Sequence, residues 1–440
     1  MKRRKFAALI MSMVMAASVM AGCGSTSQET AAEETVENTA EEADVTENAA
    51  NQNTVGTSGA PVKLTIAARG GSHVDVINAV KEKFEQENNV QIEVLGLEAA
   101  DLKQKVALDA MNAQGTYDIV MIDDPVMPEF TESGILLDLT AEGYEDDTDF
   151  LTASLALGKN PYATGDTYAL PFSGNVQLLF YNEDVLSELG AEVPETWEDV
   201  LSVCRSAKES GKNGYIIRGQ QGNPIVSDYL PLLWAYGGNV FDDNWNVLVD
   251  SDEAKAAMQM YLDLLETGEN YEKNDMVASI SGGDSAMGLG WPSWFIADGS
   301  AAADYAVIPG KATGSASSYA SGEIGNWMMG IPANCQNKEI AMKLLQYLTS
   351  EEVQRTAVDV GAVPTRTSVF TDTEILAKYP YLETLQAGTE NSVVRPRTAK
   401  WSSIEEAYGA ELSNIVAGTK TVDEGLADAK SAIEAIMSQN

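Results

Sequence analysis

Two tryptophans stand three residues apart in the segment Trp291-Pro292-Ser293-Trp294, and their types and spacing suit the binding of a flat ligand. The apolar run 286–289 and Gly290 precede them, which predicts a strand that ends in a loop. Pro292 fixes φ and removes a backbone donor, so we expect this loop to be rigid and not helical. Large aromatic rings offer apolar contact area at a small cost in rotamer freedom. The segment therefore predicts a ligand platform, and a pair of core tryptophans is the alternative.

Charged side chains follow two predicted strands. Alternating apolar residues at positions 62, 64 and 66 indicate a strand that ends near Arg69, and the mostly apolar run 117–122 ends at Asp123 and Asp124. Helical patterns between these strands favour an α/β fold, with a parallel sheet covered by helices on both faces. Because ligands bind beyond the carboxyl ends of such strands, Arg69, Asp123 and Asp124 are expected at the mouth of a site. Alternatively, one of the two aspartates caps the next helix.

The sequence offers little for catalysis. His73 is the single histidine, so a Ser-His-Asp or Cys-His arrangement would depend on it, and no nucleophile motif points to it. No zinc-binding spacing, phosphate-binding loop or dinucleotide fingerprint is present, and we expect neither a metal nor a cofactor. Glycoside hydrolysis by two carboxylates stays open on residue types alone, because acidic residues abound.

Length and charge limit the possible partners. A chain of 440 residues has room for two or three lobes, each with its own core. The formal net charge of -38 argues against nucleic acid as a partner, because phosphate binding needs clustered Lys and Arg. Cys204 and Cys335 are too few for a disulfide framework, and the sequence leaves open whether they pair. We expect a monomer.

The N-terminus has the features of a secretory signal. The basic residues 2–5 precede an apolar run that ends near Met20, and this run is too short to span a membrane stably. Met20-Ala21-Gly22-Cys23 resembles a bacterial lipobox, which implies cleavage after residue 22 and a lipid on Cys23. Residues 23–60 begin with Cys23, and the remainder is mainly Ser, Thr, Ala, Asn, Gln and Glu. This composition predicts a disordered acidic tether. We therefore expect a protein anchored by lipid at the extracellular face of the cell membrane.

A series of short motifs runs through the rest of the chain. They are Tyr117-Asp118-Ile119-Val120, Gly134-Ile135-Leu136, Tyr168-Ala169-Leu170-Pro171, Tyr181-Asn182-Glu183-Asp184, Pro194-Glu195-Thr196-Trp197, Ala286-Met287, Ile331-Pro332-Ala333 and Gly361-Ala362-Val363-Pro364-Thr365. Their order and spacing resemble those of the extracellular solute-binding proteins, family 1, of bacterial ABC importers, the maltose- and trehalose-binding type. The resemblance covers about Pro61 to the C-terminus.

This resemblance implies an architecture. Such proteins have a two-lobe, periplasmic-binding-protein-like fold of type II, with mostly parallel sheets flanked by helices and a ligand cleft between the lobes. By that likeness the chain would cross between the lobes near Asn175, near Tyr305 and near Trp327. The N-terminal lobe would hold residues 61–175 plus 306–326, and the C-terminal lobe residues 176–305 plus 327–440.

The resemblance also implies a function. The chain would be the substrate-binding component of an ABC importer, not an enzyme. It would capture a carbohydrate, either a mono- or oligosaccharide or a polyol, outside the cell and deliver it to the permease by hinge closure. A secreted carbohydrate-active enzyme is the first alternative, and the same fold with a non-sugar solute is the second.

Site residues follow from matching positions. Trp291 corresponds to a stacking aromatic, and Asn175 to a hinge residue that is often acidic in the family. Trp294 is expected to support the cleft wall, and for Arg395 a surface ion pair is an even alternative. The full set of ligand-binding candidates is Trp291, Asp123, Asp124, Asn175, Trp327, Asn326, Arg397, Trp294, Arg69, His73, Trp234 and Tyr236.

Overall fold

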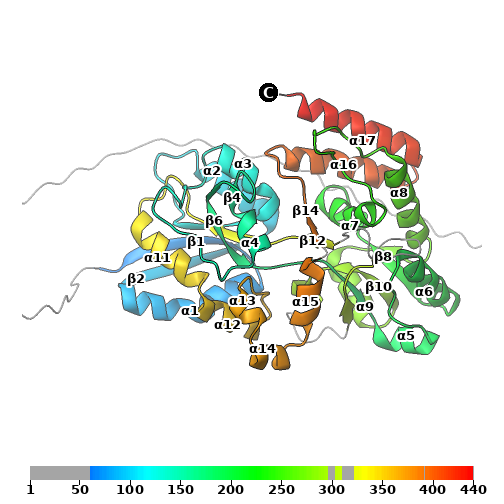
Figure 1. Ribbon diagram of the computed structural model, residues 1–440, viewed down its shortest axis with the longest axis horizontal. Coiled ribbons are helices and arrows are strands. Elements are labelled where there is room, and N and C mark those ends of the chain that lie inside the picture. Colours follow the sequence, from blue (N-terminus) through cyan, green and yellow to red (C-terminus); the bar gives the residue numbers. More distant parts are fainter. Residues whose placement is uncertain (1–59, 296–302, 310–321, 391, 440) are drawn as a thin grey trace, which may run out of the picture. The chain divides into compact units, whose positions relative to one another are not determined.

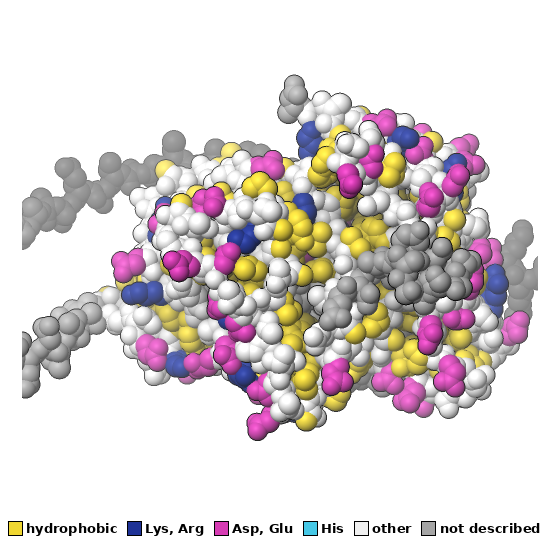
Figure 2. Space-filling view, in the orientation of Figure 1, with side chains coloured by type: hydrophobic (Ala, Val, Ile, Leu, Met, Phe, Trp, Pro, Cys, Tyr) yellow, Lys and Arg dark blue, Asp and Glu magenta, His cyan; other side chains and the backbone are white. Residues whose placement is uncertain are grey.

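A computed structural model of the protein describes residues 60–295, 303–309, 322–390 and 392–439. Residues 1–59, which hold the predicted signal peptide, Cys23 and almost all of the predicted tether, lie outside the described residues. Within the described ranges, no helix combines the length and the apolar character needed to cross a membrane. Acidic side chains are scattered over the face seen in Figure 2, in keeping with the net charge of -38.

The first lobe is built on a five-stranded sheet of order β2-β1-β3-β13-β6. β1 (Val62–Arg69) pairs in parallel with β2 (Val90–Leu97) and with β3 (Ile119–Asp123). β13 (Trp327–Gly330) lies antiparallel between β3 and β6 (Ala169–Ser173). The carboxyl ends of β1 and β3 therefore meet at one edge of the sheet.

Helices cover this sheet (Figure 1). α1 (Ser72–Asn88) and α2 (Ala99–Asp109) connect the parallel strands, and α11 (Lys338–Leu348) and α12 (Glu351–Asp359) pack against α1. The apolar residues of α1 recur at helical spacing, so one face of the helix is buried against the sheet. Shorter elements of the lobe are η1 (Asp124–Val126), α3 (Met127–Glu132), α4 (Thr152–Leu157), β4 (Lys159–Asn160) and β5 (Asp166–Thr167).

The second lobe has its own five-stranded sheet, of order β11-β7-β10-β8-β9. β10 (Ser285–Gly290) is buried throughout and pairs in parallel with β8 (Asn213–Ile217) and antiparallel with β7 (Leu178–Tyr181). β11 (Asp304–Ala306) and β9 (Glu269–Asn270) form the edges. β10 is thus a central strand, and the segment that follows it begins where the sheet ends.

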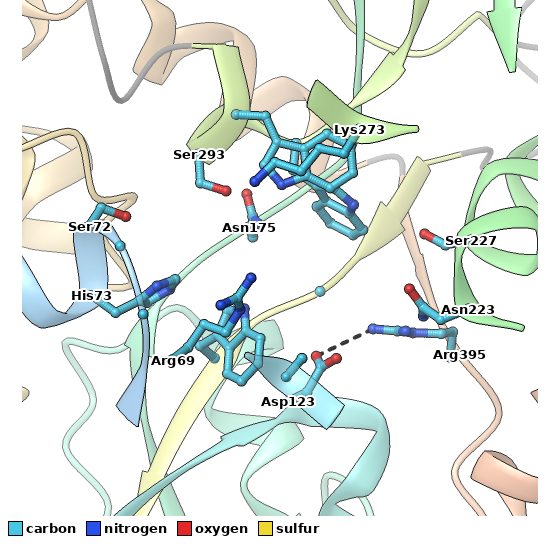
Figure 3. A pocket seen from close by; sticks show the side chains of 17 residues that line it. Arg69, Ser72, His73, Asp123, Asn175, Asn223, Ser227, Lys273, Ser293 and Arg395 are labelled. Carbon is cyan, nitrogen blue, oxygen red and sulfur yellow. Dashed lines mark ion pairs between the residues drawn. The ribbon is translucent and has the colours of Figure 1, made fainter. Parts of the chain in front are cut away.

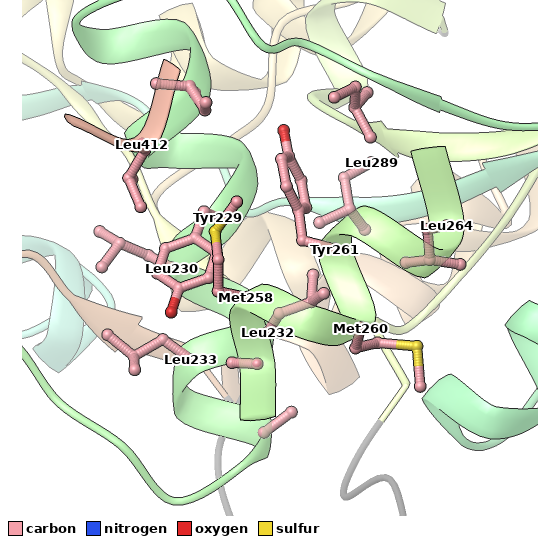
Figure 4. Close-up of a cluster of buried hydrophobic side chains, with 14 of the residues drawn as sticks. Tyr229, Leu230, Leu232, Leu233, Met258, Met260, Tyr261, Leu264, Leu289 and Leu412 are labelled. Atoms are coloured by element: carbon pink, nitrogen blue, oxygen red, sulfur yellow. The ribbon is translucent and has the colours of Figure 1, made fainter. Parts of the chain in front are cut away.

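Helices of the second lobe enclose a large aromatic and aliphatic core (Figure 4). Tyr229 packs edge-on against Tyr261, as Figure 4 shows, and against Tyr408, so that three different helices meet at these rings. Trp234 and Tyr236 belong to this core or pack against it. The helices are α5 (Glu183–Leu189), α6 (Trp197–Glu209), α7 (Asn223–Ala235), α8 (Asp252–Leu265), α9 (Lys273–Ser281), α16 (Trp401–Val416) and α17 (Val422–Met437).

Three chain segments connect the two sheets. The first runs from β6 to β7 and forms a bridge between Val176 and Ile324. The second contains β12 (Gly322–Ile324), which pairs in parallel with β14 (Ser392–Val394) of the third. A third apolar cluster lies beside them. It includes residues of α13 (Thr367–Phe370) and α15 (Tyr381–Glu390), and residues of α14 (Thr373–Lys378) pack against it. We call residues 174–177, 322–326 and 392–395 the hinge segments.

The two-lobed α/β fold is confirmed, with two corrections. Each sheet is mixed rather than mostly parallel, because β13 and β7 return antiparallel to their neighbours. The expected lobe boundaries are also wrong in part. Residues 327–359 belong to the first lobe, since β13 has hydrogen-bonded neighbours on both edges there and buried residues of α11 and α12 lie in the core of that lobe. Ile308 instead lies in the core of the second lobe.

The two described cysteines do not pair. Cys204 lies in α6 within the core of the second lobe, and Cys335 lies in the core of the first lobe. Both are buried and free. They serve as small apolar core residues, and the described fold owes nothing to a disulfide.

Candidate functional site

A cavity of about 260 Å³ lies where the ends of both sheets meet the hinge segments (Figure 3). Both lobes and all three hinge segments contribute side chains or backbone to it. Its lining residues are Arg69, Gly70, Gly71, Ser72, His73, Ala99, Asp123, Asn175, Asn223, Ser227, Lys273, Trp291, Ser293, Trp294, Gly325, Trp327 and Arg395.

The first lobe supplies one wall from strand ends that the sheet brings together. Arg69 ends β1, Asp123 ends β3, and Trp327 begins β13 directly opposite Asp123 in the ladder. The rings of His73 and Trp327 meet edge-on with their centroids 5.6 Å apart. The predicted position of Arg69 and Asp123 at the ends of neighbouring strands is therefore what the structure has, whereas Trp327 was expected in the other lobe.

His73 is a buried member of this wall. Burial, with the nearby charge of Arg69, lowers the pKa of its imidazole to about 4. The ring is consequently neutral at physiological pH. Its Nδ1 atom has no hydrogen-bond partner among the described residues. His73 can thus offer a neutral polar edge to the cavity, in addition to its place in the first turn of α1.

The second lobe supplies the segment after β10. Trp291 is 9% exposed, and a Cβ added at Gly325 would come within 2.5 Å of its ring. Trp291 thus packs closely on a hinge backbone that only glycine can provide. Pro292–Phe295 forms a short helix, α10, where a rigid non-helical loop was expected. Proline is accepted at the first position of a helix because the amide it lacks would have no partner there.

Trp294 lies among cations. The guanidinium carbon of Arg218 is 4.7 Å from the centroid of its ring, and the Nζ atom of Lys273 is 5.4 Å from it. Aromatic rings attract cations at such distances through their electron-rich faces. Trp294 therefore holds the cations of Arg218 and Lys273 near the cavity wall, in addition to the supporting role that the sequence suggested.

Asn175 and Asn326 divide their roles at the hinge. The side chain of Asn326 is buried, accepts a hydrogen bond from the Asn175 backbone amide at 2.9 Å, and donates one to Ser154 at 2.8 Å. Asn326 thus fixes the hinge backbone and does not line the cavity. Asn175 does line it, and within the described part of the chain its Oδ1 atom has no hydrogen-bond partner.

A buried ionic group joins the cavity to the hinge. Arg395 is 3% exposed and lies within ion-pair distance of Asp123 at 3.5 Å, Glu323 at 2.9 Å and Glu405 at 3.5 Å. We call these four residues the hinge cluster. They come from β3, β12, the segment after β14, and α16, so the cluster connects both lobes. Burial raises the pKa of Glu323 to about 8, although Arg395 opposes this shift.

Asp124 and Arg397 form a separate buried pair. The Arg397 guanidinium contacts the Asp124 carboxylate at 3.0 Å and donates hydrogen bonds to the backbone carbonyls of Asp124 and Leu157. Burial raises the pKa of Asp124 to about 6 against the charges of Arg395 and Arg397. Neither residue lines the cavity, so both correct the expectation of a ligand contact. They tie the segment after β14 to the first lobe.

The structure thus brings together seven of the predicted site residues. Trp291, Asp123, Asn175, Trp327, Trp294, Arg69 and His73 line the cavity. The other five do not: Asp124 and Arg397 pair with each other, Asn326 holds the hinge, and Trp234 and Tyr236 pack in the core of the second lobe.

Sequence reasoning missed several lining residues, of which Arg395, Lys273 and Asn223 are the most informative. Asn223 and Lys273 are the first residues of α7 and α9. Each helix follows a strand of the second sheet, β8 and β9 respectively, so the rule applied to Arg69 could have found them. Arg395 carries no such signal, because its burial depends on three carboxylates that are distant in the sequence.

Comparisons with known proteins agree with this geometry. Residues 70–355 match the family model described as bacterial extracellular solute-binding protein. A probable ABC transporter-binding protein of Deinococcus radiodurans is 24% identical over 59% of this chain and 67% of its own length. The mannitol-binding protein of Pseudomonas aeruginosa is 23% identical over 71% of this chain and 76% of its own. These relatives are binding proteins, which confirms the expectation that the chain is not an enzyme.

The fold is shared with a solved structure. The maltose-bound protein MalE3 of T. maritima superposes with a TM-score of 0.77 at 24% identity, over 85% of this chain and all of that one. This likeness establishes the two-lobed fold.

Proposed function

Since the chain belongs to the bacterial extracellular solute-binding proteins, whose family model covers residues 70–355, we propose that it captures a carbohydrate outside the cell for an ABC importer. The class of ligand would be a mono- or oligosaccharide or a polyol. The maltose- and mannitol-binding proteins described above support this class by likeness alone.

One observation carries the proposal, namely that the cavity combines aromatic rings with polar side chains. Trp291, Trp294 and Trp327 line it together with two amides, a carboxylate and three basic side chains. Sugars present C–H groups on their faces and hydroxyl groups around their rims, which such rings and polar groups match. A micromolar ligand needs only about 8 kcal/mol of binding free energy, so one stacked ring with several hydrogen bonds suffices.

The mechanism that follows is closure at the hinge. Because the cavity is lined from both lobes, a ligand held there makes contacts that exist only when the lobes approach each other. Such a ligand shifts the population toward the closed form by as much as it prefers that form. The closed form would be the one that the membrane-spanning permease subunits receive.

We further propose that a lipid on Cys23 anchors the mature protein at the outer surface of the membrane. The lipobox-like sequence Met20-Ala21-Gly22-Cys23 supports this proposal. A Cys23→Ala variant expressed in a bacterium with a lipoprotein pathway should be released into the medium or lose its incorporated labelled palmitate. If the variant stays membrane-bound and labelled, the anchor lies elsewhere.

Isothermal titration calorimetry on the full chain tests the ligand class. The panel should hold neutral sugars, polyols, disaccharides and anionic sugars, with amino acids and short peptides as non-carbohydrate members. We expect at least one carbohydrate to bind at micromolar concentration, and to be recovered chemically intact. Binding of an amino acid or peptide with no carbohydrate bound would overturn the proposal.

A further inference from the structure

The cavity has the opposite electrostatic character from the chain as a whole. The protein carries a formal net charge of -38, and acidic side chains are spread over the surface in Figure 2. Yet three cations line the cavity, Arg69, Lys273 and Arg395, against the single carboxylate of Asp123. Arg395 is already paired with the carboxylates of Asp123 and Glu405. Arg69 and Lys273 therefore carry the excess positive charge that faces the cavity.

Arg69 is only weakly neutralised. Its Nη2 atom lies 2.8 Å from Glu98, but the side chain of Glu98 is 78% exposed. Ion pairs with such exposed partners contribute little, because water screens the charges. The Nη1 atom donates to the backbone carbonyl of Leu97 at 3.1 Å, which holds the guanidinium in place at the end of β1. Figure 3 shows this guanidinium reaching into the cavity.

Lys273 faces the cavity from the second lobe. Among the described residues no carboxylate lies within ion-pair distance of its ammonium group, which lies over the ring of Trp294. Lys273 is exposed at the rim of the cavity, where partial desolvation and the nearby charges of Arg69 and Arg218 lower its pKa against the opposing charge of Glu98. Lys273 and Arg69 therefore lie within each other's field. Arg69 and Lys273 thus approach the same space from different lobes, and the carboxylate whose charge reaches both, that of Glu98, is 78% exposed and screened by water.

A third cation stands behind Trp294. Arg218 is 5% exposed, and its ion pair with Asp228 is long, at 3.8 Å. Its Nη2 atom is buried and has no hydrogen-bond partner among the described residues. A buried donor without a partner lowers the stability of the fold, so the Nη2 atom of Arg218 would gain from an added hydrogen-bond acceptor. An anionic group beside Trp294 would relieve the repulsion of Lys273 from both Arg69 and Arg218.

Helix ends add backbone donors to the same space. α1 begins after Gly71, which lines the cavity. α7 begins after Gly222, but Pro224 has no amide and the Ile225 amide donates to Gln220, so α7 adds little beyond the amide of Asn223. In neither helix does a side chain cap the N-terminus. The first amides of a helix carry partial positive charge and accept an anion readily. They favour the same sign of ligand charge as Arg69 and Lys273.

We propose that the ligand is an anionic carbohydrate, a sugar that carries a carboxylate or a phosphate, with its negative group held between Arg69 and Lys273. This inference rests on the proposed function and names the ligand class of the same site. The planar fork of Arg69 can bind two oxygens of such a group at once, and Lys273 adds a point charge from the other lobe. The sugar ring then lies within reach of Trp291 and Trp327, and the anion itself connects the lobes.

The test compares matched pairs of probes by calorimetry on the full chain at pH 7 and low salt. The pairs are glucuronate with glucose, galacturonate with galactose, gluconate with sorbitol, and glucose 6-phosphate with glucose. We expect at least one anionic member to bind on the order of 10-fold to 100-fold more tightly than its neutral partner. The carboxylate and phosphate arms distinguish the two sources of negative charge.

Variants of Lys273 sharpen the comparison. Lys273→Met keeps an unbranched apolar chain beside Trp294 and removes the charge, so the ratio of anionic to neutral affinity should fall by about 10-fold or more. Lys273→Arg should restore most of that ratio. Lys343→Met is the matched control, because Lys343 is an exposed residue of α11 outside the cavity, and its removal changes the net charge equally.

The outcomes separate this inference from the proposed function. Neutral sugars that bind as tightly as their anionic partners, or a ratio that Lys273→Met leaves unchanged, would overturn the inference and leave the carbohydrate proposal standing. Failure of every carbohydrate, with binding of an amino acid or peptide, would overturn both. A circular dichroism melt for each variant verifies that the protein is folded.

Discussion

Glu323 offers a test of how the hinge is held together. It lies on the hinge strand β12 with no exposure to solvent, and burial raises the pKa of its carboxyl from the usual 4.5 to about 8. A carboxyl with a higher pKa in the folded protein holds its proton more tightly there than in the unfolded chain. Its contribution to stability is therefore complete below about pH 4.5 and is lost as the pH rises toward 8.

The magnitude follows from the shift. Each pKa unit corresponds to about 1.4 kcal/mol, so at pH 7 the protein has lost roughly 3 kcal/mol of unfolding free energy relative to pH 4.5 through this residue. Glu323→Gln keeps the shape of the side chain and cannot ionise. Arg395 retains the carboxylates of Asp123 and Glu405 as partners in the variant. We therefore expect Glu323→Gln to be more stable than the wild type by about 3 kcal/mol at pH 7, and by less than about 1 kcal/mol at pH 5.

Urea denaturation between pH 5 and 8 measures this difference. Midpoints and slopes for the wild type, Glu323→Gln and the control Glu339→Gln give the unfolding free energies. Glu339 is a suitable control because its side chain is 93% exposed in α11. If Glu323→Gln is instead less stable than the wild type at pH 7 and 8, Glu323 is ionised in the folded protein. The attraction of Arg395 would then exceed the cost of burial, and the reasoning would be refuted.

Two further predictions concern the aromatic wall. Trp291→Leu keeps an apolar side chain but removes the flat ring, so carbohydrate affinity measured by calorimetry should fall by roughly 10-fold. Trp245→Leu is the control, because Trp245 is an exposed tryptophan outside the cavity, and it should leave the affinity unchanged. Gly325→Ala places a Cβ 2.5 Å from the ring of Trp291 and should displace it, which also weakens binding by about 10-fold. In the Trp291→Leu background, Gly325→Ala should have much less effect, and equal effects in both backgrounds would contradict the steric explanation.

Features that depend on nearby residues were predictable from the sequence. The start of α6 has a capping box between Thr196 and Asp199, and that of α17 has one between Thr421 and Glu424, and both have the residue types and the three-residue spacing of that motif. Each involves side chains three residues apart, so no distant contact can alter it. The ends of β1 and β3 were likewise placed correctly, because alternating strands and helices fix where parallel strands end.

Features that depend on pairing across the chain were not predictable. The segment Trp327–Gly330 is apolar enough for either sheet, and its place between β3 and β6 is set by hydrogen bonds to strands far earlier in the sequence. The same holds for Arg395 and Arg397, which are two residues apart. Only Arg395 reaches the cavity, while Arg397 turns to Asp124 and the backbone of the first lobe. Composition and spacing do not distinguish two such arginines, because the residues that each one contacts in the folded chain determine where its side chain lies.

The position of the cavity on the hinge explains why its contacts can control closure. Asn175 belongs to the first hinge segment, Gly325 to the second and Arg395 to the third, and all three line the cavity. A ligand that fills the cavity therefore touches every hinge segment, and these are the segments through which one lobe would move relative to the other in the proposed closure. Asn326 and Glu323, which do not line the cavity, hold these segments to one another and to the first lobe. The residues that recognise the ligand and those that hold the hinge are thus neighbours in the same short segments, so binding free energy acts directly on the hinge.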